Sequence, residues 1–180
     1  MYFTKHGKAS TQKTIELALQ STKERNIGHI VLASGTGYTA EYLVDSGLNV
    51  VCVTSVAGFS EKGVNNMPDD VQTSLISKGI KILTASHVLS GVERGLSSKL
   101  GGIYPAEIMA HTLRMFGQGT KVCVETSIMA LDAGLIPHGE KIIAIGGTGQ
   151  GADTAVILTP AHAQHVLETR IHEIICKPEL

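Results

Sequence analysis

Aromatic side chains are almost missing from this sequence. Phe, Tyr and Trp make up 4% of its 180 residues and tryptophan is absent, whereas hydrophobic residues as a whole make up 43%. The core must therefore be built from Val, Ile, Leu and Ala. This composition is typical of a mostly parallel sheet whose faces are covered by helices. A length of 180 residues suits one α/β domain, and we assign residues 1–180 to it.

Long apolar runs and concentrations of positive charge are also lacking. No stretch approaches the roughly 20 apolar residues of a membrane-spanning helix. The start, residues 1–7, has no apolar core of the kind that signal peptides carry. Lys and Arg are scattered and the formal net charge is −1, so we expect no nucleic-acid-binding surface. The sequence predicts a cytoplasmic protein that contacts neither membranes nor nucleic acids.

Cysteine is scarce, and no C-x-x-C motif occurs. Cys52, Cys123 and Cys176 each lie in an apolar run. Such positions are typical of small buried side chains in a reducing compartment, so we expect neither a disulfide framework nor a zinc site.

Histidine is more frequent, with eight residues. His165, Glu168 and His172 would lie on one side of a C-terminal helix, beside its apolar face. We interpret them as surface residues, and we expect no metal site. Neither an H-E-x-x-H motif nor a serine-hydrolase elbow is present.

Apolar segments alternate with amphipathic ones along the chain, which predicts strands alternating with helices and right-handed crossovers. The expected helices are residues 10–25, 39–46, 69–78, 105–116, 127–134 and 162–175. The expected strands are residues 29–33, 48–54, 80–84, 121–125, 141–145 and 154–158. Only a short loop precedes residues 154–158, so this strand should return antiparallel at one edge of the sheet. Such an edge strand could pair with the same strand of a second copy. The sequence does not decide whether the protein forms a homo-oligomer.

The most informative segment is Ala33-Ser34-Gly35-Thr36-Gly37-Tyr38-Thr39-Ala40, between a buried strand and an expected helix. Unpaired amides and the macrodipole at a helix start attract anions. The hydroxyl groups of Ser34, Thr36 and Thr39 could donate hydrogen bonds, while Gly35 and Gly37 allow the backbone to approach a ligand. We predict a phosphate site here. The alternative is an ordinary turn, because Gly, Ser and Thr are common in loops and caps.

Three further glycine-, serine- and threonine-rich loops follow expected strands. They are residues 55–67, 85–102 and 146–153. Ligands of open α/β sheets bind at the carboxyl ends of the strands, so these loops should converge with 34–39 around one ligand. For the glycine-rich 146–151 segment, a tight structural turn is the alternative. Asp153 could bind a ribose-like hydroxyl, or it could cap that turn.

One polar cluster could supply acid-base chemistry. His87, Glu93 and Arg94 could act as an acid, a base and an anion clamp. Equally, Glu93 and Arg94 could form a solvated pair, with His87 in a turn. His87 is the candidate proton donor, and no residue is assigned a catalytic role beyond that.

Residues 34–40 resemble the T-x-S-G-x-S-A loop of the pyruvate kinase C-terminal α/β domain. In that family the loop holds a phosphate of a sugar bisphosphate effector. Ser34, Thr36 and Thr39 fall on its hydroxyl positions, and Tyr38 stands where that family usually has Arg. Residues 134–146 resemble the entry to the last parallel strand of that domain, and residues 146–153 its second effector loop. The resemblance covers residues 10–55 and 118–158 and implies the fold of that domain.

The whole chain is similar to stand-alone proteins of this domain type, which implies that it binds flavin mononucleotide (FMN). Pyruvate kinase activity is not expected, because the separate catalytic barrel needs roughly 250 residues. On this interpretation the phosphate lies at 34–39 and the rest of FMN extends across the other loops. The candidate FMN-binding residues are Ser34, Gly35, Thr36, Gly37, Thr39, Thr54, Gly58, Phe59, His87, Gly146, Gly147, Thr148, Gly149, Gly151 and Asp153.

Two other functions fit the same residues. The first is a non-catalytic sensor or regulatory module for a phosphorylated metabolite. The second is a phosphotransfer or sugar-phosphate enzyme that uses His87 and Arg94.

Overall fold

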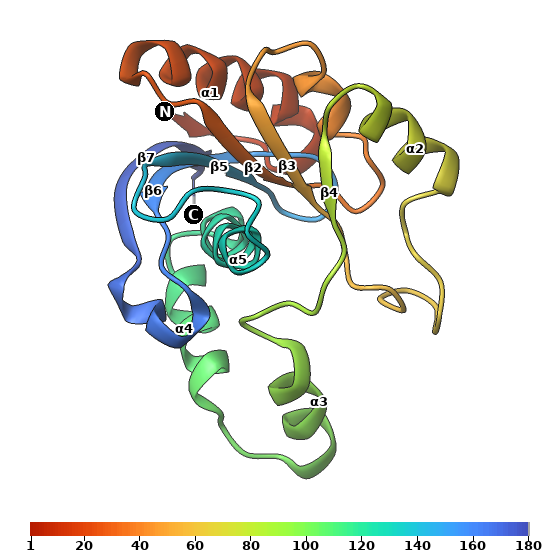
Figure 1. The fold of residues 1–180 in the computed structure, drawn as a ribbon. Helices are drawn as coiled ribbons and strands as arrows, with labels where there is room; N and C mark the ends of the chain where they lie inside the picture. The colour runs from red at the N-terminus through yellow and green to blue at the C-terminus, as the bar shows by residue number, and fades with distance from the viewer. Residues whose placement is uncertain (180) are drawn as a thin grey trace.

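A seven-stranded sheet organises the chain, and the computed structural model describes residues 1–179. The strand order is β1-β7-β6-β5-β2-β3-β4 (Figure 1). The strands are β1 (Tyr2–Phe3), β2 (His29–Ala33), β3 (Asn49–Val53), β4 (Lys81–Leu83), β5 (Ile142–Gly146), β6 (Thr154–Thr159) and β7 (Arg170–Pro178).

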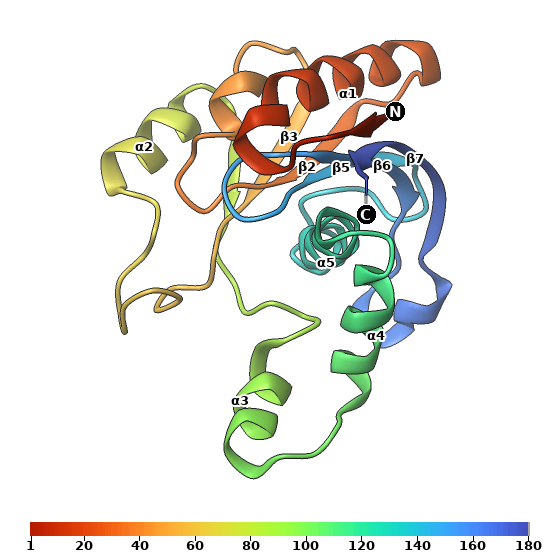
Figure 2. The same cartoon turned by 180° about the vertical axis from the view of Figure 1, so that it is seen from behind.

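Helices cover both faces of this sheet. The α-helices are α1 (Thr11–Arg25), α2 (Asp69–Ser77), α3 (Gly91–Leu100), α4 (Pro105–Arg114) and α5 (Gln118–Asp132). Short 3-10 helices are η1 (Gly7–Ser10), η2 (Ala40–Leu43) and η3 (Ala163–Glu168). α1 and α2 lie on one face and α5 on the other (Figures 1 and 2). None of the helices in residues 1–179 is long and apolar enough to cross a membrane.

The predicted fold class, a mostly parallel α/β sheet between helical layers, is confirmed. β2 pairs in parallel with both β3 and β5, and β3 with β4. Successive residues of each strand point to opposite faces of the sheet and belong to two separate hydrophobic cores. Ile30, Leu32 and Cys52 pack toward α1, whereas Val31 and Val51 pack toward α5. The central strands are apolar throughout because both of their faces are buried.

The predicted antiparallel strand exists, but it does not lie at an edge. β6 runs antiparallel between β5 and β7, and β7 in turn pairs in parallel with β1. The edges among the described residues are β1 and β4. The hypothesis that residues 154–158 pair across a dimer is therefore wrong, because both sides of β6 are already paired.

Three expected elements differ from the structure: the strand over 121–125 and the helix over 162–175 were wrong, and the helix over 127–134 is part of a longer one. Residues 121–125, expected as a strand, and 127–134, expected as a separate helix, fall almost entirely in the single helix α5. This helix is buried on almost every side, so it lacks the solvent-exposed polar face that marks an amphipathic helix in a sequence. Residues 162–175, expected as a helix, form η3 and most of β7. There, β-branched Ile171 and Ile174 pair along β6, so tertiary pairing decides the local structure.

Two smaller differences concern the loops. The helix expected over 39–46 is only the four-residue η2. The expected loop 85–102 contains α3, which the sequence pattern did not indicate.

Close packing of α5 on the sheet requires glycine at position 119. A Cβ atom there would collide with the Thr154 side chain and lie 2.9 Å from an Asp153 carboxylate oxygen. We expect Gly119→Ala to lower the free energy of unfolding by about 1–3 kcal/mol, as overpacking does elsewhere. Urea unfolding measures the loss. Gly95→Ala is the matched helical control, since a Cβ at Gly95 meets nothing within 4 Å. Equal stability of the two variants would contradict the need for glycine at this contact.

Candidate functional site

The carboxyl ends of β2, β3 and β5 open into a cavity of about 790 Å³. This volume lies within the roughly 300–1,000 Å³ of typical ligand pockets. All four predicted loops contribute to the wall. Its lining residues include Ser34, Gly35, Thr36, Thr39, Thr54, Phe59, His87, Gly147, Gly149 and Gly151. The expected convergence of these loops on one site is therefore present in the fold.

Five predicted site residues do not line the cavity and instead shape the loops. Gly37 and Gly58 have positive φ angles of 87° and 86°. A Cβ on Gly37 would lie 2.6 Å from Val71 Cγ1, so this turn needs glycine for space as well. Gly146 ends β5, where a Cβ would lie 2.6 Å from the Gly119 carbonyl oxygen. Thr148 donates its backbone N–H to the carboxylate of Asp153. Asp153 itself is the fifth residue that does not line the cavity.

Asp153 caps the turn, which was the alternative to binding a ribose-like hydroxyl. It is fully buried. One carboxylate oxygen accepts the N–H groups of Gly7 at 2.7 Å and Thr148 at 3.0 Å, and the other accepts the Thr154 hydroxyl at 2.7 Å. Through these three hydrogen bonds the carboxylate caps the 146–153 loop and connects this loop to the N-terminal segment.

The 34–39 loop presents backbone donors that no protein group uses. Within residues 1–179, the N–H groups of Gly35, Thr36, Gly37 and Tyr38 have no protein acceptor. The loop is held in place by Ser34, whose N–H donates to Val53 at 3.0 Å and whose Oγ accepts the Thr39 N–H at 3.2 Å. Gly35 packs so closely that a Cβ would lie 2.8 Å from Ser55 Oγ.

The helix start that was expected to favour an anion at this loop is replaced by other groups. A helix of four residues has little macrodipole, so η2 does not supply the potential expected from a helix over 39–46. The free amides and the Thr36 hydroxyl remain as donors. Lys8, from η1, adds a full positive charge beside them, with Nζ 4.7 Å from the centre of the Tyr38 ring.

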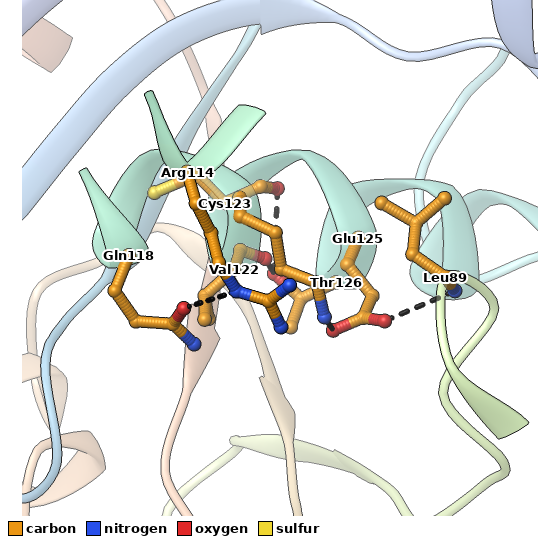
Figure 3. Close-up of polar contacts among 8 residues, drawn as sticks. Leu89, Arg114, Gln118, Val122, Cys123, Glu125 and Thr126 are labelled. Atoms are coloured by element: carbon orange, nitrogen blue, oxygen red, sulfur yellow. Dashed lines mark hydrogen bonds and ion pairs between the residues drawn. The ribbon is translucent and has the colours of Figure 1, made fainter. Parts of the chain in front are cut away.

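Another part of the cavity wall is strongly basic, and only its Arg94 was expected from the sequence. Arg94 from α3, Arg114 from α4 and Lys121 from α5 all line the cavity. Arg114 Nε donates to Gln118 Oε1 at 2.8 Å (Figure 3). Glu125 is the one carboxylate in this wall among the described residues. The cavity therefore carries an excess of positive charge.

Lys121 and Glu125 form a buried ion pair in that wall, each with a side chain only 4% exposed. Glu125 is fixed further by the Leu89 N–H, which donates to its second oxygen at 3.0 Å (Figure 3). Burial lowers the pKa of Lys121, and the charges of Arg114 and Arg94 lower it further, while Glu125 opposes the shift. The i, i+4 spacing of the two charges in an apolar run was the sequence signal for a helix facing a polar site.

Of the predicted acid-base cluster, only two members meet in the cavity. His87 and Arg94 line it, and the His87 ring lies 6.2 Å from that of Phe59. Glu93 instead accepts the Ala106 N–H at 2.9 Å and so ties α3 to α4. Neither the three-residue cluster nor a Glu93–Arg94 pair is formed.

The histidine-rich C-terminal segment does not form a cluster either. His165 lies 3.6 Å from Glu168, while His172 lies on β7 beside Thr159. Residues 1–179 contain no group of three or more His, Cys, Asp or Glu side chains placed to hold a metal ion.

The three cysteines are buried and free. Burial raises the pKa of the Cys52 thiol to about 12, and burial also raises the pKa values of Cys123 and Cys176. These thiols are core side chains, as the sequence predicted.

Residues 12–158 match the family described as the pyruvate kinase alpha/beta domain. The chain belongs to this family. Solved structures of pyruvate kinase from Cryptosporidium parvum are similar to it. One shares 17% identity with a TM-score of 0.42 over 83% of this chain and 22% of the kinase. A second shares 15% with a TM-score of 0.36 over 90% and 22%. A third, in complex with ADP, shares 17% with a TM-score of 0.40 over 82% and 22%.

This pyruvate kinase alpha/beta domain protein thus spans about a fifth of the length of the kinases it matches. The family match confirms the resemblance found in the sequence. The segment that carries Arg94 and Arg114 lies between the two stretches on which that resemblance rests.

Proposed function

We propose that this protein binds FMN in the cavity at the carboxyl ends of β2, β3 and β5. The main support is the set of N–H groups of Gly35, Thr36 and Tyr38, three residues that line the cavity and whose N–H groups have no protein acceptor within residues 1–179, with Lys8 beside them. Backbone amides with a nearby cation suit a phosphate, as helix and loop anion sites do elsewhere. The Thr36 hydroxyl adds a side-chain donor.

The remainder of the cavity suits the rest of FMN. Thr54 and the backbone of Gly147 and Gly149 line the space next to the phosphate loop and offer polar partners to a ribityl chain. Phe59 is an exposed large apolar residue on the cavity wall, and Gly58, with its N–H bonded to Val64 at 2.8 Å, shapes the turn that presents it. A flat isoalloxazine ring would cover Phe59 and His87.

A bound flavin would supply hydride or electron transfer, and the chain's own residues would hold and orient it. His87 lines the cavity and stays the candidate proton donor. The proposal concerns binding and assigns no substrate.

An absorption spectrum and an FMN titration test this proposal. We expect the purified protein to be yellow, or to quench FMN fluorescence saturably with a Kd in the micromolar range, about −8 kcal/mol. A colourless protein that leaves FMN fluorescence unchanged would contradict it.

A phosphorylated metabolite other than FMN is the second candidate. Arg94, Arg114 and Lys121 favour it, because a flavin ring does not need three cations whereas a ligand with a second anionic group would use them. Titration calorimetry with sugar phosphates and nucleotides would then give the tighter binding, and the protein would act as a sensor or regulatory module.

A further inference from the structure

The groups that attract anions to the cavity come from two separate layers of the fold. One set is the 34–39 loop with Lys8. Lys8 lies on η1, directly before α1, and the loop packs on α2, since a Cβ on Gly37 would lie 2.6 Å from Val71 Cγ1. Helices α1 and α2 cover one face of the sheet (Figures 1 and 2). The proposed phosphate site therefore belongs to that layer.

The second set, which we call the basic wall, consists of Arg94, Arg114 and Lys121 and belongs to the layer on the other face. These residues lie on α3, α4 and α5 in turn. Helix α5 covers that face, and hydrogen bonds tie α3 to α4 and α4 to α5. Both sets line the same cavity, which therefore offers two places for an anion.

The two arginines of the basic wall have no acidic partner. Neither Arg94 nor Arg114 forms an ion pair with a carboxylate of residues 1–179. The neighbouring carboxylate, that of Glu125, is already taken by the Lys121 ammonium and the Leu89 N–H. Planar guanidinium groups bind carboxylate and phosphate oxygens through paired hydrogen bonds. The basic wall is therefore suited to an oxyanion.

Keeping these cations together is unfavourable while no anion is bound. Burial lowers the pKa of Lys121, and the charges of Arg114 and Arg94 lower it further, so the three cations repel one another. Figure 3 shows the Arg114 guanidinium on the same side of α5 as the Glu125 carboxylate. A cleft lined by charges of one sign concentrates ligands of the opposite sign. An oxyanion held by the two guanidinium groups would remove the repulsion.

FMN leaves the basic wall without such an anion. Its charged group is the phosphate, which we place at the 34–39 loop, while its ribityl chain and oxidised ring are neutral. We infer that the basic wall binds the carboxylate or phosphate group of a second small molecule, which lies in the cavity beside FMN. The inference rests on the proposed FMN site and names the class of molecule that would meet the flavin, a small organic anion.

Titration of FMN-saturated protein with inorganic phosphate and with malonate tests the inference. Excess FMN keeps the 34–39 loop occupied, and constant ionic strength removes general salt effects. Calorimetry should detect binding of at least one of these anions to the wild type. Arg94→Gln should weaken it at least ~10-fold, the effect of losing one charge-assisted hydrogen bond. Arg94 is exposed on α3, so the fold should persist, and Arg114→Gln should act in the same way.

Arg25→Gln is the matched control. It makes the same substitution at an arginine that pairs with Glu173 on the surface, outside the cavity, and anion affinity should stay within about twofold of wild type. An FMN-saturated wild type that binds neither anion would overturn the inference. Phosphate that binds only by displacing FMN would overturn it too, as would an Arg94→Gln protein that binds the anion as tightly as Arg25→Gln does.

A failure of the FMN proposal itself would give a different result. If the protein binds no FMN, phosphate titration of Thr36→Glu still tests the basic wall, because a carboxylate then blocks the loop. Binding that Thr36→Glu retains and Thr36→Glu/Arg94→Gln loses would support the wall, and its loss in Thr36→Glu alone would overturn it. FMN binding that Arg94→Gln loses and Thr36→Glu keeps would place the FMN phosphate on the wall, against both proposals.

Discussion

Thr36→Glu should weaken FMN binding by at least ~100-fold if the phosphate lies in the 34–39 loop. The variant places a carboxylate among the free amides of that loop, where it competes with the phosphate. Two like charges about 4 Å apart near a protein surface repel by about 4 kcal/mol, and each 1.4 kcal/mol changes affinity about tenfold. Thr36 itself is exposed, so the substitution leaves the fold intact. Fluorescence titration measures the affinity, and thermal unfolding checks the fold.

Thr73→Glu provides the matched control for that substitution. It makes the same change of residue type and charge at an exposed position on α2, outside the cavity, and FMN affinity should stay within about twofold of wild type. If Thr36→Glu binds FMN as tightly as Thr73→Glu does, the phosphate does not lie at residues 34–39.

The second large effect concerns stability. Glu125→Leu removes the partner of a buried ammonium and the acceptor of the Leu89 N–H, and it leaves Lys121 beside Arg94 and Arg114 without a counter-charge. Breaking a buried ion pair from one side typically lowers the free energy of unfolding by about 3–5 kcal/mol. Urea unfolding at neutral pH should show a loss of this size.

The pH dependence of this loss follows from the lowered pKa of Lys121. Without Glu125, the folded protein binds the lysine proton less tightly than the unfolded chain does. The unfolded state then holds more protons, so the variant gains stability as pH rises toward the ordinary lysine pKa. The difference from wild type should shrink over that range.

Two further variants separate the buried pair from an ordinary helical ion pair. Glu16→Leu breaks the exposed Lys13–Glu16 pair, which spans 3.0 Å with both side chains about half exposed, and should change stability by less than about 1 kcal/mol. The double variant Lys121→Met/Glu125→Leu removes both buried charges and should recover much of the loss. A Glu125→Leu protein as stable as Glu16→Leu would show that the pair is not desolvated.

The sequence predicted those parts of the fold whose local pattern agrees with their surroundings. The helix from Thr11 to Arg25 has a buried side and an exposed side, and the strands around Val31 and Val51 are short apolar runs bounded by polar or glycine residues. Prediction failed where burial removes that contrast. α5 is buried on almost every side, so its sequence lacks an exposed polar face and its apolar segment resembles that of a buried strand. β7 is defined by its pairing with β6 and β1, which no local pattern reveals.

The candidate site, too, has parts that the sequence predicted and parts that it did not. Its four glycine-rich loops were predictable, because the carboxyl ends of parallel strands gather such loops at one edge of a sheet. Of the basic wall, only Arg94 was predicted, as an anion clamp. Its combination with Arg114 and Lys121 was not, because the three residues lie on three helices, two of which were unrecognised or misassigned. The N-terminal segment around Lys8 reaches the site by packing on the 146–153 loop. Asp153 illustrates the converse case, a polar residue in a ligand loop whose bonds are all internal.

The relative affinity of FMN and riboflavin tests phosphate binding at residues 34–39 most directly, because the two ligands differ only in the phosphate. Charge-assisted hydrogen bonds contribute about 1.5–3 kcal/mol each, so two or more of them in this loop predict that wild-type protein binds FMN at least ~100-fold more tightly than riboflavin. Thr36→Glu should abolish that preference. Equal affinities of the wild type for FMN and riboflavin would contradict a phosphate site in this loop.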